Sequence, residues 1–178
     1  MGNFLERGGE ESYEQSVLFC SGFVNVSVGL ILQRENRFLM IEEAKYDLRG
    51  LWNFPSGKVN VGELIILAAQ REAAEETGYQ VKVTDLMSVY YYLSRQPGSG
   101  GRSDRLTIRF NLWASLVEGV KPADFSSDTT SVEWKTLEEI HTLSQEGKLR
   151  NWITKRMIDE VERGVRLPLS ALYTVDRR

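Results

Sequence analysis

The chain has 178 residues, of which 42 % are apolar, so its length predicts one domain with a sizeable core. The net charge of -3 and the pI of about 5.4 argue against a basic surface for extended nucleic acid. Because Cys20 and His141 are the only residues of their types, an internal disulfide is excluded and a Cys/His zinc site is disfavoured.

The N-terminal segment, MGNFLERGGEESYEQ, is acidic where a secretory signal is basic and apolar. No run of 18 apolar residues is present, so we expect no membrane partner and a cytoplasmic location. We divide the chain into an N-terminal extension at 1–21 and a single domain at 22–178. Within the domain, residues 23–32 alternate between apolar and polar side chains, which predicts a β-strand. After a turn, residues 37–43 predict a second strand.

A loop rich in turn residues, KYDLRGLWNFP, follows at 45–55 and contains Trp52. A tryptophan at this position has two interpretations, a core side chain or a wall of a binding pocket. We count Trp52 among the substrate-binding candidates and keep the core interpretation as its alternative.

The stretch from Glu63 to Thr77 contains neither proline nor glycine, so it predicts a helix, and Gly78 supplies a left-handed C-terminal cap. Three glutamates at 72, 75 and 76 fall within a sector roughly 100° wide. Carboxylates are unfavourable in a last helical turn, because that end carries partial negative charge. A hard divalent cation, Mg²⁺ or Mn²⁺, would compensate them. The alternative is a solvated amphipathic face.

Strands are predicted again after this helix, at 80–93 and 105–117, separated by a flexible loop at 94–104. In the first strand, alternation sends Tyr91 to the face opposite Tyr90 and Tyr92. We choose Tyr91 as a candidate for stacking on a substrate ring. In the second strand, Arg109 is the candidate for substrate contact, and a solvated strand face is the alternative.

The C-terminal part predicts a loop at 118–131, a short strand at 132–135, a helix near 137–143 and an amphipathic helix at 149–163. Gly164 ends the last helix. The loop at 118–131 is rich in acidic and small polar residues.

A set of fixed spacings resembles the Nudix box, G-x5-E-x7-R-E-U-x-E-E-x-G-U, where U is bulky and apolar. The matching residues are Gly57, Glu63, Arg71, Glu72, Ala73, Glu75, Glu76, Gly78 and Tyr79. The pattern departs from the box at Ala73, which is small. The resemblance implies an α+β fold, the Nudix α/β/α sandwich with a mixed curled sheet and a box of loop, helix and loop. It also implies a hydrolase that cleaves a nucleoside diphosphate linked to a further group X.

The resemblance implies metal ligands. In the family, the glutamates matching Glu72, Glu75 and Glu76, with the backbone carbonyl matching Ser56, hold about one to three Mg²⁺ or Mn²⁺ ions. Glu72 and Glu76 are therefore the catalytic candidates in the box. Several members add a carboxylate from a later loop, and here we choose Asp128. The general base is Glu72 or Asp128.

Other box residues have structural roles by the same resemblance. The glutamate matching Glu63 pairs with the arginine matching Arg71, which makes Arg71 a scaffold residue. Gly57 and Gly78 are assigned to the box structure with them.

We therefore expect metal-dependent hydrolysis of a pyrophosphate bond in a small nucleoside di- or triphosphate, with water attacking phosphorus. The alternatives are a Nudix enzyme for ADP-ribose, an oxidised nucleotide or a capped RNA end, and a non-catalytic nucleotide sensor. A shorter resemblance points to small bacterial Nudix phosphatases that act on nucleoside tri- and diphosphates and on hydroxymethylpyrimidine pyrophosphate. It rests on Leu51-Trp52-Asn53 before the box and on Gly164, Arg166, Pro168 and Leu169. A homodimer is left open.

Overall fold

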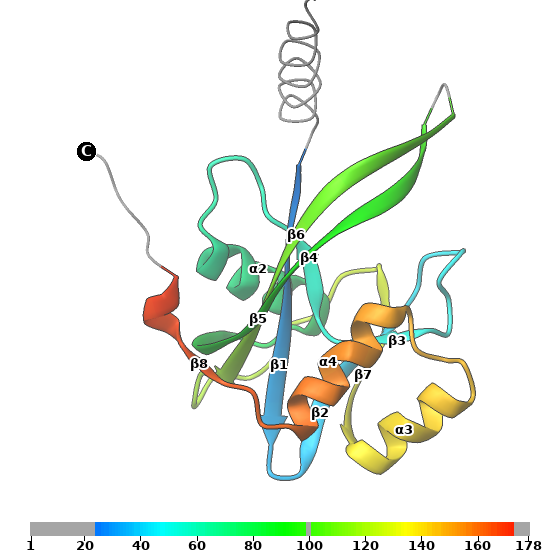
Figure 1. The fold of residues 1–178 in the computed structure, drawn as a ribbon. Helices are drawn as coiled ribbons and strands as arrows, with labels where there is room; N and C mark the ends of the chain where they lie inside the picture. The colour runs from blue at the N-terminus through cyan, green and yellow to red at the C-terminus, as the bar shows by residue number, and fades with distance from the viewer. Residues whose placement is uncertain (1–23, 99–100, 173–178) are drawn as a thin grey trace, which may run out of the picture.

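The computed structural model describes residues 24–98 and 101–172, so the extension predicted at 1–21, with Cys20, lies outside the described residues. Within these residues the chain forms an eight-stranded sheet in the order β3-β2-β1-β6-β5-β8, with β4 paired to β1 and β7 paired to β2 (Figure 1). The strands are β1 (Asn25–Arg34), β2 (Arg37–Glu43), β3 (Trp52–Asn53), β4 (Ser56–Lys58), β5 (Val81–Gly98), β6 (Gly101–Leu116), β7 (Thr129–Thr136) and β8 (Leu167–Pro168). The helices are α2 (Ile65–Thr77), α3 (Leu137–Gln145), α4 (Trp152–Glu162) and the short 3-10 turn η1 (Leu169–Ala171).

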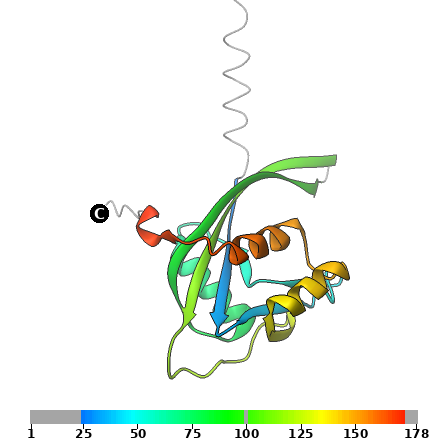
Figure 2. The same cartoon turned by 60° about the horizontal axis from the view of Figure 1, so that its bottom comes forward.

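The sheet is mixed, because β1 runs parallel to β6 and antiparallel to β2 and β4. It is covered by α2 on one face and by α3 and α4 on the other (Figure 2). Along β1, Leu30 and Leu32 pack with α2, whereas Ile31 packs with α4. Alternate residues of one strand are therefore buried on opposite faces, and the expected α/β/α sandwich is confirmed.

Helix α2 lies close to the sheet because its inner face carries three fully buried alanines, Ala68, Ala69 and Ala73. Gly78 ends it with a φ of 72°, and a Cβ at this position would lie 2.0 Å from the carbonyl oxygen of Ala123. A side chain here would meet both backbone strain and a clash. The helix begins at Ile65, two residues later than predicted, so Glu63 belongs to the preceding loop.

The flexible segment predicted at 94–104 belongs for the most part to a hairpin of paired strands. Strands β5 and β6 stay paired out to Gly98 and Gly101, and the resulting two-stranded arm extends beyond the body of the sheet (Figure 1). The pairing register of the adjacent strands continues through small and polar residues that give no strand signal of their own. None of the described helices has the length and hydropathy needed to cross a membrane.

Candidate active site

Arg71 joins the loop before α2 to the glutamates on the helix. Its Nε donates to Glu63 Oε1 at 2.8 Å and its Nη2 to Glu63 Oε2 at 2.9 Å, a two-point ion pair. Its Nη1 donates to Glu72 at 2.8 Å and to Glu75 at 3.2 Å. The guanidinium beside Glu63 lowers the pKa of that carboxyl to about 2. Arg71 thus orders the loop and two carboxylates at once.

Glu72 and Glu76, in the C-terminal half of α2, point towards the box loop. A Cβ on Gly57 would lie 1.9 Å from Glu72 Cδ, so glycine leaves the space that this carboxylate occupies. Glu76 Oε2 accepts a hydrogen bond from the backbone N–H of Ser56 at 2.7 Å. Burial raises the pKa of Glu76 to about 8, and burial also raises the pKa of Glu72.

These side chains have the chemistry of a site for a hard divalent cation. Carboxylate oxygens are the preferred ligands of Mg²⁺, and the glycine cradle at 57 brings one of them against the backbone of β4. Among the described residues, no three His, Cys, Asp or Glu side chains converge into a ready-made metal cluster. The contacts explain this, because Arg71 draws Glu72 and Glu75 while Ser56 holds Glu76. The donor set fits a divalent ion that competes with those contacts.

An ion pair between distant segments stands beside the box. Glu43, which is 3 % exposed at the end of β2, pairs with Arg150 Nη1 at 2.7 Å. Both charges act on Glu76, Glu43 raising its pKa and Arg150 lowering it. Sequence reasoning missed this pair. The available signal was Glu43 itself, an acid on the same face of its strand as the buried Ile41.

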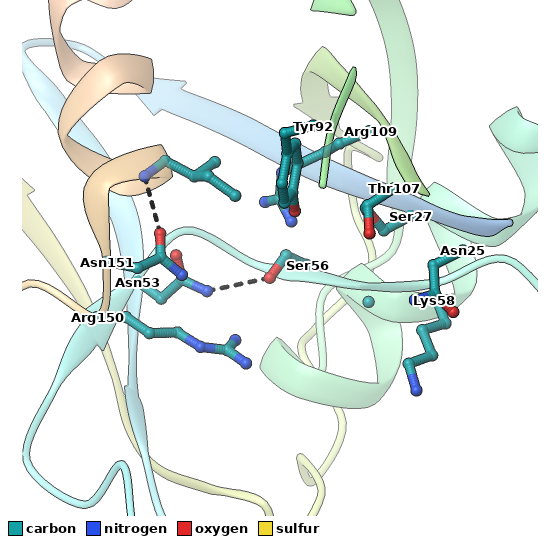
Figure 3. A pocket seen from close by; sticks show the side chains of 12 residues that line it. Asn25, Ser27, Asn53, Ser56, Lys58, Tyr92, Thr107, Arg109, Arg150 and Asn151 are labelled. Atoms are coloured by element: carbon teal, nitrogen blue, oxygen red, sulfur yellow. Dashed lines mark hydrogen bonds between the residues drawn. The ribbon is translucent and has the colours of Figure 1, made fainter. Parts of the chain in front are cut away.

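A cavity of about 230 Å³ adjoins the box and is lined by β1, β4, β5, β6 and the start of α4 (Figure 3). Ser56 and Gly57 line it on the box side, and three cationic side chains, Lys58, Arg109 and Arg150, line it as well. Among the described lining residues, none is Asp or Glu. The arrangement places a positively charged cavity next to a group of carboxylates.

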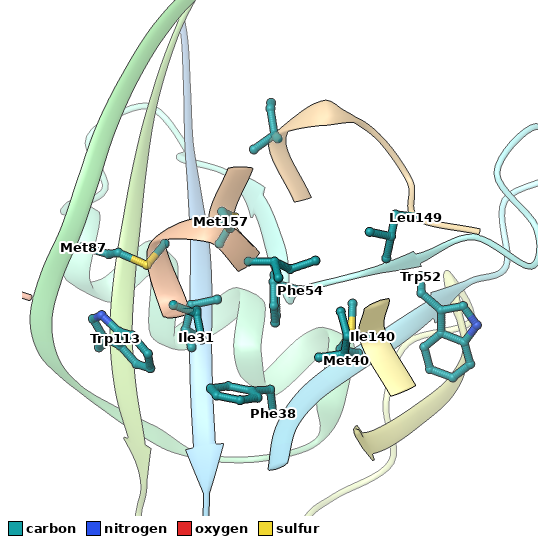
Figure 4. Close-up of a cluster of buried hydrophobic side chains, with 13 residues drawn as sticks. Ile31, Phe38, Met40, Trp52, Phe54, Met87, Trp113, Ile140, Leu149 and Met157 are labelled. Atoms are coloured by element: carbon teal, nitrogen blue, oxygen red, sulfur yellow. The ribbon is translucent and has the colours of Figure 1, made fainter. Parts of the chain in front are cut away.

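The structure places two of the substrate-binding candidates, Trp52 and Tyr91, outside the cavity. Trp52 is 8 % exposed and packs in the core cluster with Phe54 and Leu149, while Lys135 Nζ covers its ring at 3.9 Å (Figure 4). It does not line the cavity, because its side chain is taken up by the core. Tyr91 is 81 % exposed, and alternation turns its neighbour Tyr92 into the cavity instead. Arg109, the third candidate, lines the cavity.

Asp128 lies in the loop before β7. Its carboxylate pairs with Lys45 Nζ at 3.1 Å and its side chain is 60 % exposed. The backbone N–H of Ser126 donates to the carbonyl of Glu75 at 2.7 Å, so this loop packs against the end of α2. The structure brings the Asp128 loop to the box helix, but no contact joins Asp128 to the box carboxylates.

Comparison with known proteins gives concordant matches. The family model described as the NUDIX domain matches residues 24–158. A Nudix hydrolase of Caenorhabditis elegans is 29 % identical over 138 residues, 76 % of this chain and 34 % of the relative, so the chain spans about a third of that protein. The 8-oxo-dGDP phosphatase NUDT18 of Mus musculus is 41 % identical over 64 residues, 36 % of this chain and 20 % of its own length.

Two further matches cover most of both proteins. The phosphatase NudJ of Escherichia coli K12 is 27 % identical over 149 residues, 83 % of this chain and 90 % of NudJ. A solved NUDIX hydrolase structure from Nitrosomonas europaea has a TM-score of 0.72 and 24 % identity, covering 86 % of this chain and 98 % of its own. The structural likeness supports the fold.

Proposed function

The chain belongs to the NUDIX domain family, and on this premise we propose that it is a hydrolase that cleaves a pyrophosphate bond of a small nucleoside di- or triphosphate with the help of divalent metal ions. One observation supports this proposal above the others. The partly buried carboxylates of Glu72 and Glu76 adjoin a cavity that carries three cationic side chains and, among its described lining residues, no acid. Such a pairing suits a substrate with a metal-bound diphosphate.

The box glutamates are the proposed metal ligands. Glu72, Glu75 and Glu76 would hold Mg²⁺ or Mn²⁺ together with the Ser56 backbone, and Arg71 would keep the first two oriented. When bound, such an ion neutralises charge on phosphate oxygens and acidifies a bound water. The protein's own contribution is positioning, which is the main requirement of phosphoryl transfer.

Lys58 and Arg150 are placed to bind phosphate oxygens. Both line the cavity together with Ser56 and Gly57, the residues on its box side. Arg150 is oriented by its ion pair with the buried Glu43. A guanidinium held in this way loses little freedom when it binds an anion.

A general base must accept the proton of the attacking water, and two carboxylates are candidates. Glu72 is mostly buried within the box, whereas Asp128 is largely exposed and neutralised by Lys45. Glu72 is therefore the stronger candidate for proton transfer.

The substrates of the relatives suggest which compounds to assay first. NUDT18 is named for 8-oxo-dGDP, which makes an oxidised guanine nucleotide a second candidate substrate, and NudJ is named as a phosphatase. We expect nucleoside diphosphates to release inorganic phosphate and the nucleoside monophosphate.

The test is a panel of dGDP, 8-oxo-dGDP, dGTP, ADP-ribose and hydroxymethylpyrimidine pyrophosphate, assayed with Mg²⁺ and in EDTA, with products separated by ion-exchange chromatography. Glu76→Gln should lose at least about 100-fold in kcat. Glu138→Gln, an exposed glutamate of α3, is the matched control and should retain wild-type turnover. Turnover in EDTA equal to that in Mg²⁺, or full activity of Glu76→Gln, would show the proposal to be wrong.

A further inference from the structure

The far side of the cavity holds a buried cation with no anionic partner. Arg109 on β6 is 8 % exposed, and among the residues that the structure describes no carboxylate forms an ion pair with it. Its Nε donates to Asn111 Oδ1 at 3.0 Å, and its Nη2 reaches only the weak acceptor Met157 Sδ at 3.8 Å. Burial lowers the pKa of Arg109 to about 10, so it stays charged at neutral pH. Its remaining N–H groups are available to a ligand that enters the cavity.

The guanidinium is fixed in place by a glycine beneath it. A Cβ on Gly29 would lie 2.3 Å from Arg109 Nη2, so only glycine leaves room for the side chain over β1. Gly29 pairs with Ser56 on its other side, which places the guanidinium over the strand next to the box strand β4. Arg109 is thus held at a defined position inside the cavity.

The neighbouring amide oxygens are already engaged in hydrogen bonds. The Oδ1 atoms of Asn53, Asn111 and Asn151 already accept from Thr154, from Arg109 itself and from the α4 backbone. Ser27, which pairs with Arg109 across the β1–β6 ladder, has a buried hydroxyl without a hydrogen-bond partner in the described part of the chain. This end of the cavity consequently presents donors in excess.

The shape of the cavity favours a ring over a second phosphate. Its volume of about 230 Å³ is below the roughly 300 to 1,000 Å³ of sites for whole drug-sized ligands, so it suits one part of a substrate. Tyr92 lies beside Arg109, away from Arg150, and Ile153 adds an apolar side chain (Figure 3). A planar ring can stack on Tyr92 while one of its oxygens meets the guanidinium.

We propose that Arg109, which pairs with Ser27 across the β1–β6 ladder, selects the base of the nucleoside through a ring carbonyl oxygen, so that the enzyme prefers bases with a 6-keto group, such as guanine and hypoxanthine, over adenine. Arginine only donates hydrogen bonds, and the amino group of adenine also donates, so adenine leaves the buried guanidinium without an acceptor. This inference rests on the proposed function, because it concerns the ring of the substrate whose diphosphate the box would hold.

The test compares the binding of IMP and AMP, which differ at position 6 in presenting a carbonyl or an amino group. Calorimetry of these monophosphates needs no turnover. Wild type should bind IMP about tenfold or more tightly than AMP. Arg109→Met should bring the two affinities within about threefold of each other. Arg37→Met, at an exposed arginine that begins β2 and does not line the cavity, should keep the wild-type ratio.

Two more variants protect the test against misfolding of Arg109→Met. Gly29→Ala keeps the charge but displaces the guanidinium, and Ser27→Ala removes only the unpartnered hydroxyl. Gly29→Ala should lose the preference as Arg109→Met does, and Ser27→Ala should weaken it a few-fold, both with wild-type circular dichroism.

The inference is overturned if wild type binds AMP as tightly as IMP, or if Arg109→Met retains the preference. It is also overturned if Arg109→Met weakens the binding of inorganic pyrophosphate as much as the binding of IMP, because the guanidinium would then bind phosphate rather than the base. A preference for IMP without any hydrolysis would leave this inference standing and refute the proposed function. Equal turnover of dGDP and dADP would support the proposed function and refute the base preference.

Discussion

Replacing Gly57 by alanine tests how closely the box loop and helix α2 fit together. The new Cβ would lie 1.9 Å from Glu72 Cδ and 2.1 Å from both carboxylate oxygens, whereas ordinary contacts begin at 3.4 Å. Glu72 must therefore retreat by roughly 1.5 Å, away from β4 and from its 2.8 Å hydrogen bond with Arg71. Since a misplacement of about 1 Å can cost a reaction about 100-fold, we expect kcat/KM to fall by about that factor.

The assay is hydrolysis of a nucleoside diphosphate over a Mg²⁺ titration, in which Gly57→Ala should also need more Mg²⁺ for half-maximal rate. Gly62→Ala is the matched control. Gly62 has a φ of 80° and nothing within 4 Å of an added Cβ, so this variant should lose about 1 kcal/mol of stability and no activity. Wild-type kcat/KM and Mg²⁺ dependence in Gly57→Ala would refute the reasoning.

Three further predictions concern single side chains. In metal-free protein, burial raises the pKa of Glu76 to about 8, so between about pH 4.5 and 8 the folded state holds a proton that the unfolded state releases. The free energy of unfolding by urea in EDTA should then fall as pH rises through this window, by up to about 1.4 kcal/mol per pH unit, and an equal slope in Glu76→Gln would contradict the assignment. Glu72→Gln should lower kcat at least about 100-fold, whereas Asp128→Asn should lower it less than about tenfold, because Asp128 is exposed and paired with Lys45. If stopped-flow measurements showed the opposite order, Asp128 would be the general base. Tyr92→Ala should weaken IMP binding in calorimetry by about 5- to 100-fold, whereas Tyr91→Ala, on the exposed face, should leave it unchanged, and a larger loss in Tyr91→Ala would restore the original assignment.

The layers of the fold follow from local patterns that a sequence displays directly. Alternation along 23–32 predicts which side chains of β1 share a face, and the structure buries Leu30 and Ile31 on opposite faces. The helix over the box glutamates and its end at Gly78 follow from composition and from the need for a left-handed cap. The two faces of β1 and the end of α2 are set by residues close together in sequence, which is why the sequence predicts them.

The cavity depends on contacts between segments that are distant in sequence, and the alternation of side chains along a strand does not predict those contacts. Alternation separates Tyr91 from Tyr92 but does not say which face lines a cavity, and the structure selects Tyr92. Trp52 was open to two interpretations until the core contacts around Phe54 decided between them. The pair of Glu43 with Arg150 joins two segments far apart in the chain, and neither residue alone indicates its partner.

The central claim is that Glu72 and Glu76 of α2 bind divalent ions. Its most direct test is the affinity for Mn²⁺, followed by electron paramagnetic resonance of the free ion, in wild type, in the double variant Glu72→Gln/Glu76→Gln and in the control Glu138→Gln. We predict that wild type and the control bind Mn²⁺ equally and that the double variant binds it at least about tenfold more weakly. Equal affinity in the double variant and wild type would contradict the claim.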